Sequence, residues 1–204
     1  MYNSDWSPDN VTVSGTDLSL IVTNPTGRSP IGAEIRSTRS GWGYGTYATT
    51  VLTRFDSMPR SVIFGNLFTY DFTPDVEDQT NEIDIGEISA WGVADAQPSL
   101  TSSYKTSGQP GNVIGYNIPL PQQLDVTTHV MDWEPGRIRF QAFRGRNARG
   151  RAISSATLTG AKVPVPRDER VVFNLWVTDA NGNDEQSTPN FAVTIGRFRF
   201  RRHP

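Results

Sequence analysis

Three acidic residues, Glu82, Asp84 and Glu87, alternate with isoleucines in one short stretch of the sequence. In an extended strand, Glu82 and Asp84 point to one face and the isoleucines beside them point to the other. Glu87 lies an odd number of residues from Asp84 and would turn to the isoleucine face of a regular strand. A β-bulge at Gly86 absorbs one residue and restores the phase, so we predict a bulge that brings all three acids to one face.

The spacing of the two glutamates suits a reaction that needs a pair of carboxyl groups. With one residue absorbed in the bulge, their Cα atoms stand about 13 Å apart. The two side chains lean together and leave the carboxyl groups about 5–6 Å apart, the separation of a retaining glycosidase pair. In that chemistry one carboxylate attacks the anomeric carbon, and the other protonates the leaving oxygen and then activates water. The alternative is a solvated face of an edge strand, where acids protect against aggregation.

The elements that must position these acids are predicted to be β-strands. The 204 residues include 18 glycines and 14 prolines, which punctuate short stretches rich in Val, Ile, Phe and Tyr. Residues 11–22 alternate as a hairpin, and further period-two stretches lie at about 44–52, 61–70, 82–89, 100–106, 137–143, 171–177 and 191–201. We therefore expect an all-β fold, a jelly-roll sandwich of two antiparallel sheets, as a single domain over residues 1–204.

Composition narrows the classes of function. The absence of cysteine excludes disulfides, thiolate zinc sites and cysteine nucleophiles, and two histidines leave little for a metal cage. No apolar run is long enough to span a membrane. The formal net charge of -2 argues against polyanion binding by bulk electrostatics, although arginines crowd residues 137–151 and 197–202. The first residues lack the basic and apolar stretches of a signal peptide, which leaves the compartment open.

The stretch Glu-Ile-Asp-Ile-Gly-Glu at 82–87 resembles the Glu-x-Asp-x-x-Glu signature of glycoside hydrolase family 16. Residues 32–37, 43–47, 66–70, 129–140 and 174–176 resemble other strands of that family in the same order, so the likeness covers nearly the whole chain. The resemblance implies a jelly roll with a substrate groove on its concave face and an endo-acting retaining β-glycanase. It also implies that Glu82 is the nucleophile, Asp84 its assisting acid and Glu87 the general acid/base.

Two departures from the family pattern bear on this expectation. Lichenases have one residue fewer between the two glutamates, whereas laminarinases and marine galactanases have the longer spacing found here. The stretch at 194–197 lacks the aspartate that often helps to bind a structural calcium in this family. We therefore expect no cofactor and no metal.

Polar and aromatic residues on the neighbouring strands are candidates for sugar binding. Asn66, Phe68 and Tyr70 are predicted to share a face, as are Asn174 and Trp176, and aromatic planes beside hydrogen-bonding groups suit sugars. Arg36 is either a ligand of sugar hydroxyls or an ion-pair partner of Glu34. Core packing is the alternative for Phe68 and for Trp176. His129 and Trp133 are interpreted as structural.

Four functional hypotheses remain open. The first is hydrolysis of internal β-1,3 or mixed β-1,3/1,4-glucan linkages, and the second is hydrolysis of an acidic or galactan-type polysaccharide such as succinoglycan, carrageenan or agar, which arginines near a cleft would suit. The third is a non-catalytic glycan-binding sandwich. The weakest is nucleic-acid binding through residues 137–151 and 197–202. We expect a monomer with a polysaccharide partner, no nucleic-acid or membrane partner and, from the family resemblance, a secreted or extracellular protein.

Overall fold

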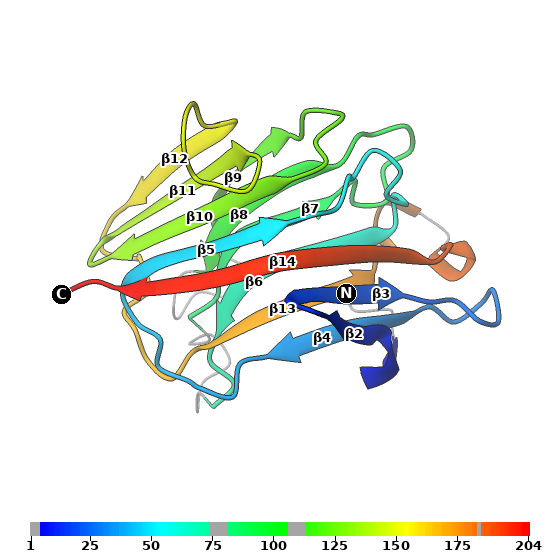
Figure 1. The fold of residues 1–204 in the computed structure, drawn as a ribbon, viewed down its shortest axis with the longest axis horizontal. Helices are drawn as coiled ribbons and strands as arrows, with labels where there is room; N and C mark the ends of the chain where they lie inside the picture. The colour runs from blue at the N-terminus through cyan, green and yellow to red at the C-terminus, as the bar shows by residue number, and fades with distance from the viewer. Residues whose placement is uncertain (1–4, 74–80, 106–112, 183–184) are drawn as a thin grey trace.

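The computed structural model describes residues 5–73, 81–105, 113–182 and 185–204, and it shows two seven-stranded β-sheets packed face to face (Figure 1). The first sheet has the order β1-β4-β13-β6-β7-β8-β9, and the second has the order β12-β11-β10-β5-β14-β3-β2. All strand pairs are antiparallel except β1 with β4, among the strands described. The predicted all-β jelly-roll sandwich is therefore confirmed.

The strands and short helices have the following bounds. The first sheet contains β1 (Asp5–Trp6), β4 (Ile31–Arg36), β13 (Arg170–Val177), β6 (Val62–Tyr70), β7 (Ile83–Ser89), β8 (Ser99–Lys105) and β9 (Val113–Pro119). The second sheet contains β12 (Ser154–Thr159), β11 (Arg137–Arg144), β10 (Thr127–Glu134), β5 (Gly45–Val51), β14 (Phe191–Arg202), β3 (Asp17–Val22) and β2 (Val11–Ser14). Single turns of 3-10 helix lie at η1 (Pro8–Asn10), η3 (Ala180–Gly182) and η4 (Glu185–Ser187).

Every stretch with a predicted period of two forms a strand. The hairpin at 11–22 consists of β2 and β3, and its turn contains Gly15 with a φ of 60°, a conformation that glycine adopts without strain. The periodicity missed β1, β4, β9, β10 and β12. β10 is buried along most of its length and so does not alternate, whereas β12 is rich in Ser and Thr, which is weak evidence for a strand.

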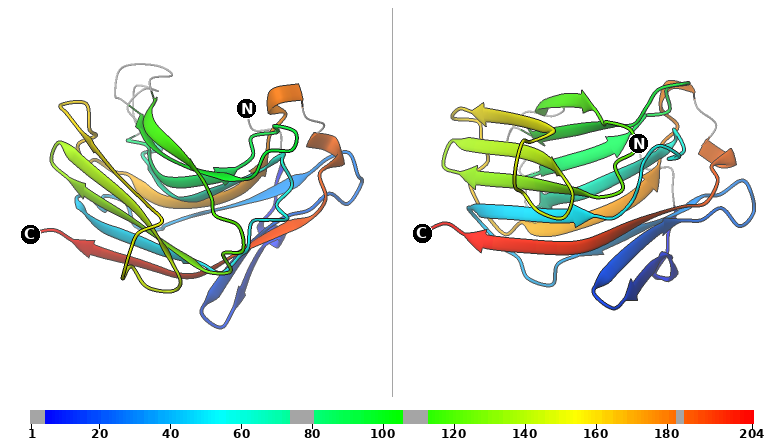
Figure 2. Two further views of the ribbon diagram at one scale, coloured as in Figure 1. Left: turned by 90° about the horizontal axis from the view of Figure 1, so that it is seen from above. Right: turned by 45° about the horizontal axis from the view of Figure 1, so that its top comes forward.

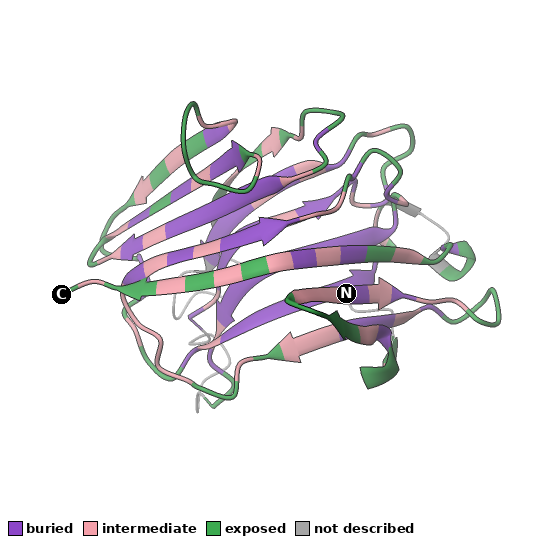
Figure 3. Cartoon of the chain, in the orientation of Figure 1, coloured by how far each residue is buried: buried purple, intermediate pink, exposed green. Residues whose placement is uncertain are grey.

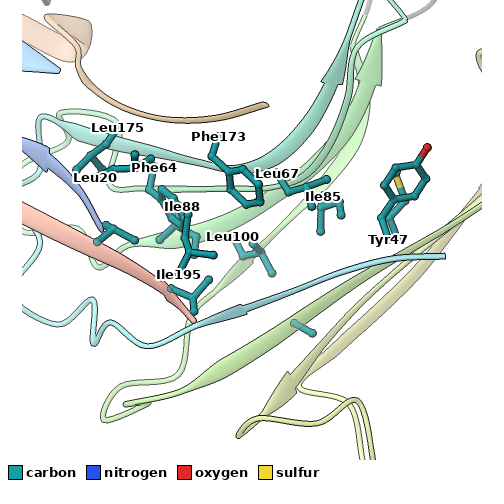
Figure 4. Close-up of a cluster of buried hydrophobic side chains, with 14 of the residues drawn as sticks. Leu20, Tyr47, Phe64, Leu67, Ile85, Ile88, Leu100, Phe173, Leu175 and Ile195 are labelled. Atoms are coloured by element: carbon teal, nitrogen blue, oxygen red, sulfur yellow. The ribbon is translucent and has the colours of Figure 1, made fainter. Parts of the chain in front are cut away.

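The core lies between the two sheets. The first sheet supplies Leu67, Ile85 and Ile88, and the second supplies Tyr47 and Ile195 (Figure 4). β6 is buried along almost its entire length (Figure 3). It is the fourth of the seven strands of the first sheet, and β7 lies beside it.

Both sheets bend in the same direction, with the first sheet on the inside of the bend (Figure 2). The outer face of the first sheet is therefore concave and that of the second sheet is convex. Of the helices that the structure describes, none has the length and apolar character needed to cross a membrane.

Candidate active site

The predicted bulge is present in β7. Asp84 pairs with Ser103 of β8, whereas Glu87 pairs with Thr101, so two residues of β7 lie opposite the single residue Ser102. The two residues that share this single partner are Ile85, whose side chain is in the core, and Gly86. Glu87 consequently returns to the concave face that Asp84 occupies.

Gly86 is required at the bulge because its missing side chain would point into the core. A Cβ atom built there lies 2.2 Å from Cδ1 of Leu100 and 4.0 Å from Nδ1 of His129. Ser102, opposite the bulge, donates a hydrogen bond of 2.5 Å to the carbonyl of Ile85. The bulge is therefore held from both its core side and its neighbouring strand.

A second bulge in β6 matches the first. Val172 of β13 pairs with Phe68, but Asn174 pairs with Gly65, so β6 also carries one extra residue. β6 and β7 stay in register with each other through this region, with Asn66 opposite Gly86. Leu67, at the bulge, has a left-handed φ of 55°. Two adjacent strands thus bulge at the same level of the sheet.

This second bulge corrects the predicted position of Asn66. Residues directly opposite each other in an antiparallel pair point to the same side, and Gly86 faces the core. Asn66 therefore lies on the core side, fully buried, and does not share the concave face with Phe68 and Tyr70. Neither polar atom of its side chain has a hydrogen-bond partner among the described residues.

The concave face carries two rows of cross-strand partners at the level of the acids. The pairing places the Glu87 row as Glu34, Asn174, Gly65, Glu87, Thr101 and Asn117, from β4 to β9. The Asp84 row runs Arg36, Val172, Phe68, Asp84 and Ser103. A polymer that crosses the strands would therefore meet the acids near the middle of the sheet.

Asp84 is held in a fixed position on this face. Its side chain is buried, and Oδ2 accepts a hydrogen bond of 2.7 Å from the hydroxyl of Ser103. Glu87, in the next row, is half-buried beside Gly65, where a side chain would meet Oδ1 of Asn174 at 2.2 Å. The absence of a side chain at position 65 makes room for the amide of Asn174 in the Glu87 row.

Glu82 is placed by the residue before it. Asn81 has a left-handed φ of 49°, its side-chain amide donates to the carbonyl of Val165 at 2.6 Å, and its own carbonyl accepts from Thr69 at 2.7 Å. The next residue, Ile83, is in the core and starts β7. Glu82 is half-buried and stands one residue before β7, so we place it on the face of Asp84 by extending the alternation of the strand back from Ile83.

A groove of about 800 Å³ opens next to the acids. Its lining consists of Trp6, Ser7, Pro8, Glu34, Arg36, Phe68, Tyr70 and Phe72. Phe68 belongs both to this lining and to the Asp84 row, so the groove is continuous with the acidic face. The predicted residues Arg36, Phe68 and Tyr70 thus lie together on one side of the acids.

Arg36 forms the ion pair with Glu34 that was one of its two predicted roles, and it also lines the groove. Its Nε atom lies 2.6 Å from Oε1 of Glu34, and its guanidinium lies 3.9 Å from the centre of the Phe72 ring. Half of the Arg36 side chain is exposed. The positive charge at this end of the groove is therefore compensated.

Asn174 and Trp176 share the concave face, as predicted. Nδ2 of Asn174 contacts Oε2 of Glu34 at 3.4 Å, and its Oδ1 has no hydrogen-bond partner among the described residues. Asn174 is the partner of Gly65 in the Glu87 row, so this free acceptor lies near the acids. Trp176, which is 8 % exposed, presents only an edge to solvent.

Sequence reasoning missed five residues of the groove lining, Ser7 and Pro8 among them. Glu34 was considered only as a partner of Arg36, and its place in the Glu87 row emerges from the pairing of β4 with β13. Phe72 follows Phe68 and Tyr70 at a spacing of two, which was a usable signal. Trp6 lies in a two-residue strand, which is too short for periodicity to detect.

His129 supports the acidic strand from inside the core, which agrees with its structural interpretation. Burial lowers its pKa to about 4, so the imidazole is neutral at neutral pH. Its Nε2 atom lies 2.9 Å from the hydroxyl of Thr127, and its Nδ1 atom faces the bulge without a partner among the described residues. Asn66 and His129 thus bring polar atoms to the core side of the two bulges.

The described residues contain one group that could hold a metal ion. Ligand atoms of Asp132, Glu134 and His203 lie within 4.8 Å of one another on the convex face, away from the acids of β7. Arg137 already forms ion pairs with both carboxylates of this group, because its Nε atom is 2.9 Å from Oε2 of Glu134 and its Nη2 atom is 3.8 Å from Oδ2 of Asp132. The arrangement is a complete ion-pair network and does not fit a metal well.

Several solved structures with the same fold are described as polysaccharide enzymes or as relatives of them. A Bacillus licheniformis β-glucanase matches with a TM-score of 0.75 and 20% identity, covering 100% of this chain and 87% of its own. The κ-carrageenase from Pseudoalteromonas carrageenovora, solved with a carrageenan oligosaccharide, matches with a TM-score of 0.68 and 14% identity over 98% and 84%. Rv0315 of Mycobacterium tuberculosis, described as a pseudo β-1,3-glucanase, matches with a TM-score of 0.69 and 15% identity over 98% and 82%.

The chain has the family 16 glycoside hydrolase fold. No model of a protein family and no curated protein matches the sequence. The likeness is therefore one of structure, and it extends over the full length of the chain. One protein with this fold is described as a pseudo-glucanase. The fold of family 16 therefore does not by itself specify an enzymatic activity.

Proposed function

We propose that the protein is an endo-acting retaining β-glycanase that hydrolyses internal β-1,3 or mixed β-1,3/1,4-glucan linkages. The observation that carries the proposal is the bulge at Gly86, which brings Glu87 to the face of Asp84 and Glu82 beside an aromatic groove. A solvated strand face needs no such bulge, no bond from Ser103 to a buried Asp84 and no row of polar residues across the sheet.

In the proposed mechanism, the Glu82 carboxylate attacks the anomeric carbon while Glu87 protonates the glycosidic oxygen that leaves. The glycosyl-enzyme ester is then hydrolysed by water, which Glu87 deprotonates, and the configuration at the anomeric carbon is retained. Asp84, held by Ser103, hydrogen-bonds Glu82 and keeps the three carboxyl groups chemically distinct. The roles of Glu82 and Glu87 are assigned by the resemblance to family 16.

The charge of the groove supports a neutral substrate. Arg36 is the arginine that lines it among the described residues, and Glu34 neutralises this charge at 2.6 Å. Phe68, Tyr70 and Phe72 offer rings against which pyranose faces can pack. A charged polymer such as carrageenan is therefore the second candidate, because the arginines expected near the cleft lie elsewhere.

The proposal is tested by incubating the purified protein with laminarin, lichenan, agarose, carrageenan and succinoglycan and sizing the products. We expect internal cleavage of laminarin or lichenan, and NMR of the first products should show the β-anomer. Glu82→Gln and Glu87→Gln should each lower kcat by about 10³-fold or more with an unchanged circular dichroism spectrum. Glu134→Gln, on the convex face, is the matched control and should retain full activity.

Four results would count against the proposal. Full activity in Glu82→Gln removes this residue from the mechanism, and an α-anomeric first product shows inversion. Binding of glucan without release of any product identifies a non-catalytic glycan-binding protein of the same fold. Cleavage confined to the sulfated or acylated polymers assigns the second candidate.

A further inference from the structure

The convex face of the second sheet carries the arginines that the sequence places in two separate segments. Along the second half of β14, Arg197, Arg199 and Arg201 alternate with Phe198 and Phe200, and the arginines are the exposed members (Figure 3). Both phenylalanines pack on Trp42 on the core side. The arginines therefore project outward, on the side of the molecule away from the acids of β7.

Three arginines from these segments converge on one small hollow. Arg197 and Arg199 form one wall, and Arg146, in the loop after β11, forms the other. Ala48, Thr50 and Thr128 form the floor. Pairing of β14 with β5 places Thr50 beside Arg197 and Ala48 beside Arg199, so small side chains leave the space open between the walls. The hollow has a volume of about 80 Å³, enough for one oxyanion with a few waters.

The anion preference of the hollow comes from its three arginines, since both threonine hydroxyls donate their protons inside the protein. Thr128 donates its hydroxyl proton to the carbonyl of Gly145 at 2.7 Å, and Thr50 lies 3.2 Å from the Thr128 oxygen, to which it donates. The three guanidinium groups make no ion pair and no side-chain hydrogen bond with any other residue that the structure describes. Guanidinium groups only donate, so their partner is a group that only accepts, such as a carboxylate or a sulfate.

We infer that the hollow formed by Arg146, Arg197 and Arg199 binds a carboxylate or sulfate group of an acidic polysaccharide. That the polyanion is a polysaccharide rests on the proposed function as a polysaccharide hydrolase, and this acidic polymer is distinct from the neutral glucan of the groove. The described residues that line the hollow include no aromatic ring for base stacking, which argues against a nucleic acid. The groove and the hollow lie on opposite faces, so an acidic polymer in the hollow leaves the groove open.

The inference is tested by electrophoresis of the full chain in gels that contain alginate, κ-carrageenan or neutral lichenan. We expect alginate or carrageenan to retard the wild type, with the stronger retardation telling a carboxylate from a sulfate. Arg197→Gln/Arg199→Gln should weaken this binding by about tenfold or more at low salt. Arg139→Gln/Arg201→Gln is the control, because it removes the same charge from the convex face outside the hollow. It should change the binding by less than twofold.

Three results would overturn the inference. Equal losses in the two double variants show diffuse charge attraction, and retention of duplex DNA with the same dependence on Arg197 and Arg199 identifies a general polyanion surface. Absence of retardation of the wild type also excludes the site. Glu82→Gln should bind the acidic gels as the wild type does. Because this variant lacks the proposed nucleophile, the outcome for the hollow is separate from the outcome for hydrolysis.

Discussion

Asp84 is the acid whose surroundings the structure defines most closely. It is buried between two acids that are only half-buried, and Ser103 donates to it at 2.7 Å. A buried carboxylate without enough donors is costly, so the hydroxyl of Ser103 both stabilises and orients it. Asp84 is thus the fixed point relative to which the two glutamates act.

Ser103→Ala should lower kcat by about tenfold and leave the thermal midpoint within a few degrees. A hydrogen bond to a charged group contributes about 1.5–3 kcal/mol, and a loss of 1.4 kcal/mol in the transition state is tenfold in rate. Kinetics on the best glucan and a thermal melt check this. Ser155→Ala, on an exposed position of β12, is the control and should change neither value. An unchanged kcat in Ser103→Ala would show that catalysis does not depend on the orientation of Asp84 by Ser103.

The buried imidazole of His129 should make the protein acid-sensitive. The pKa is about 4 in the folded state against 6.5 for an ordinary histidine, so the unfolded chain binds more protons between these values. The free energy of unfolding should fall by about 3 kcal/mol as the pH drops from 6.5 through 4. Urea unfolding at several pH values measures this. His129→Gln should flatten the dependence, whereas His203→Gln should keep it.

Individual residues were predictable where alternation and one bulge sufficed. Glu87 could be placed from the sequence because Gly86 marks the bulge within the same strand. Asn66 could not, because its face depends on a second bulge that the sequence at 66–67 does not signal with a glycine. The backbone at Leu67 adopts a left-handed φ, which a leucine rarely does, and only the pairing with β7 explains it.

At the scale of elements, the paired bulges of β6 and β7 are the device that builds the acidic face. They bring Asn66 and Leu67 of one strand, and Ile85 and Gly86 of the other, to the core side at one level. Bulges increase local twist and bending, and they often lie next to functional sites. The two bulges therefore increase the twist and bending of the first sheet at the level of the acids.

Gly86→Ala should destabilise the protein by about 1–3 kcal/mol and also lower kcat, because the added methyl meets Leu100 in a packed core. Chemical denaturation and kinetics measure the two effects. Leu100→Ala opens space at the same point, so the double variant should cost less than the sum of the single variants. Additive losses would show that Gly86 and Leu100 do not conflict and that the glycine serves another purpose.

Elements with one buried face were the predictable ones. β14 and β11 alternate between exposed and buried residues, and their periodicity identified them. β10 packs against β5 and β11 in the middle of the second sheet and is buried on both faces over much of its length, which removes the alternation. Burial on both faces is a tertiary property that a single strand sequence does not record.

At the scale of the whole molecule, the core joins both sheets into one unit. Side chains from nearly every described strand contribute to a single apolar cluster. Unfolding in a calorimeter should therefore be one transition with a calorimetric enthalpy equal to the van't Hoff enthalpy. Two resolved transitions would mean that the sheets, or the hairpin of β2 and β3, unfold separately.

The whole-molecule scale is also where sequence reasoning about the arginines was incomplete. Their clustering at 137–151 and 197–202 was visible, and it suggested a charged substrate near the cleft. The pairing of β14 with β5 and of β10 with β11 places these segments on the second sheet instead. The sheet to which a strand belongs is decided by its neighbours. The arginines therefore lie on the convex face of the second sheet, away from the groove.

The in-register pairing of the two bulged strands has an implication for how this chain can change in length. Removing the residue at position 86 alone would leave β6 with one extra residue that has no partner in β7. Removing residues 67 and 86 together would straighten both strands and restore every cross-strand match with β13 and β8. Insertions and deletions at these two places, on consecutive strands, are therefore expected to be inherited as a pair.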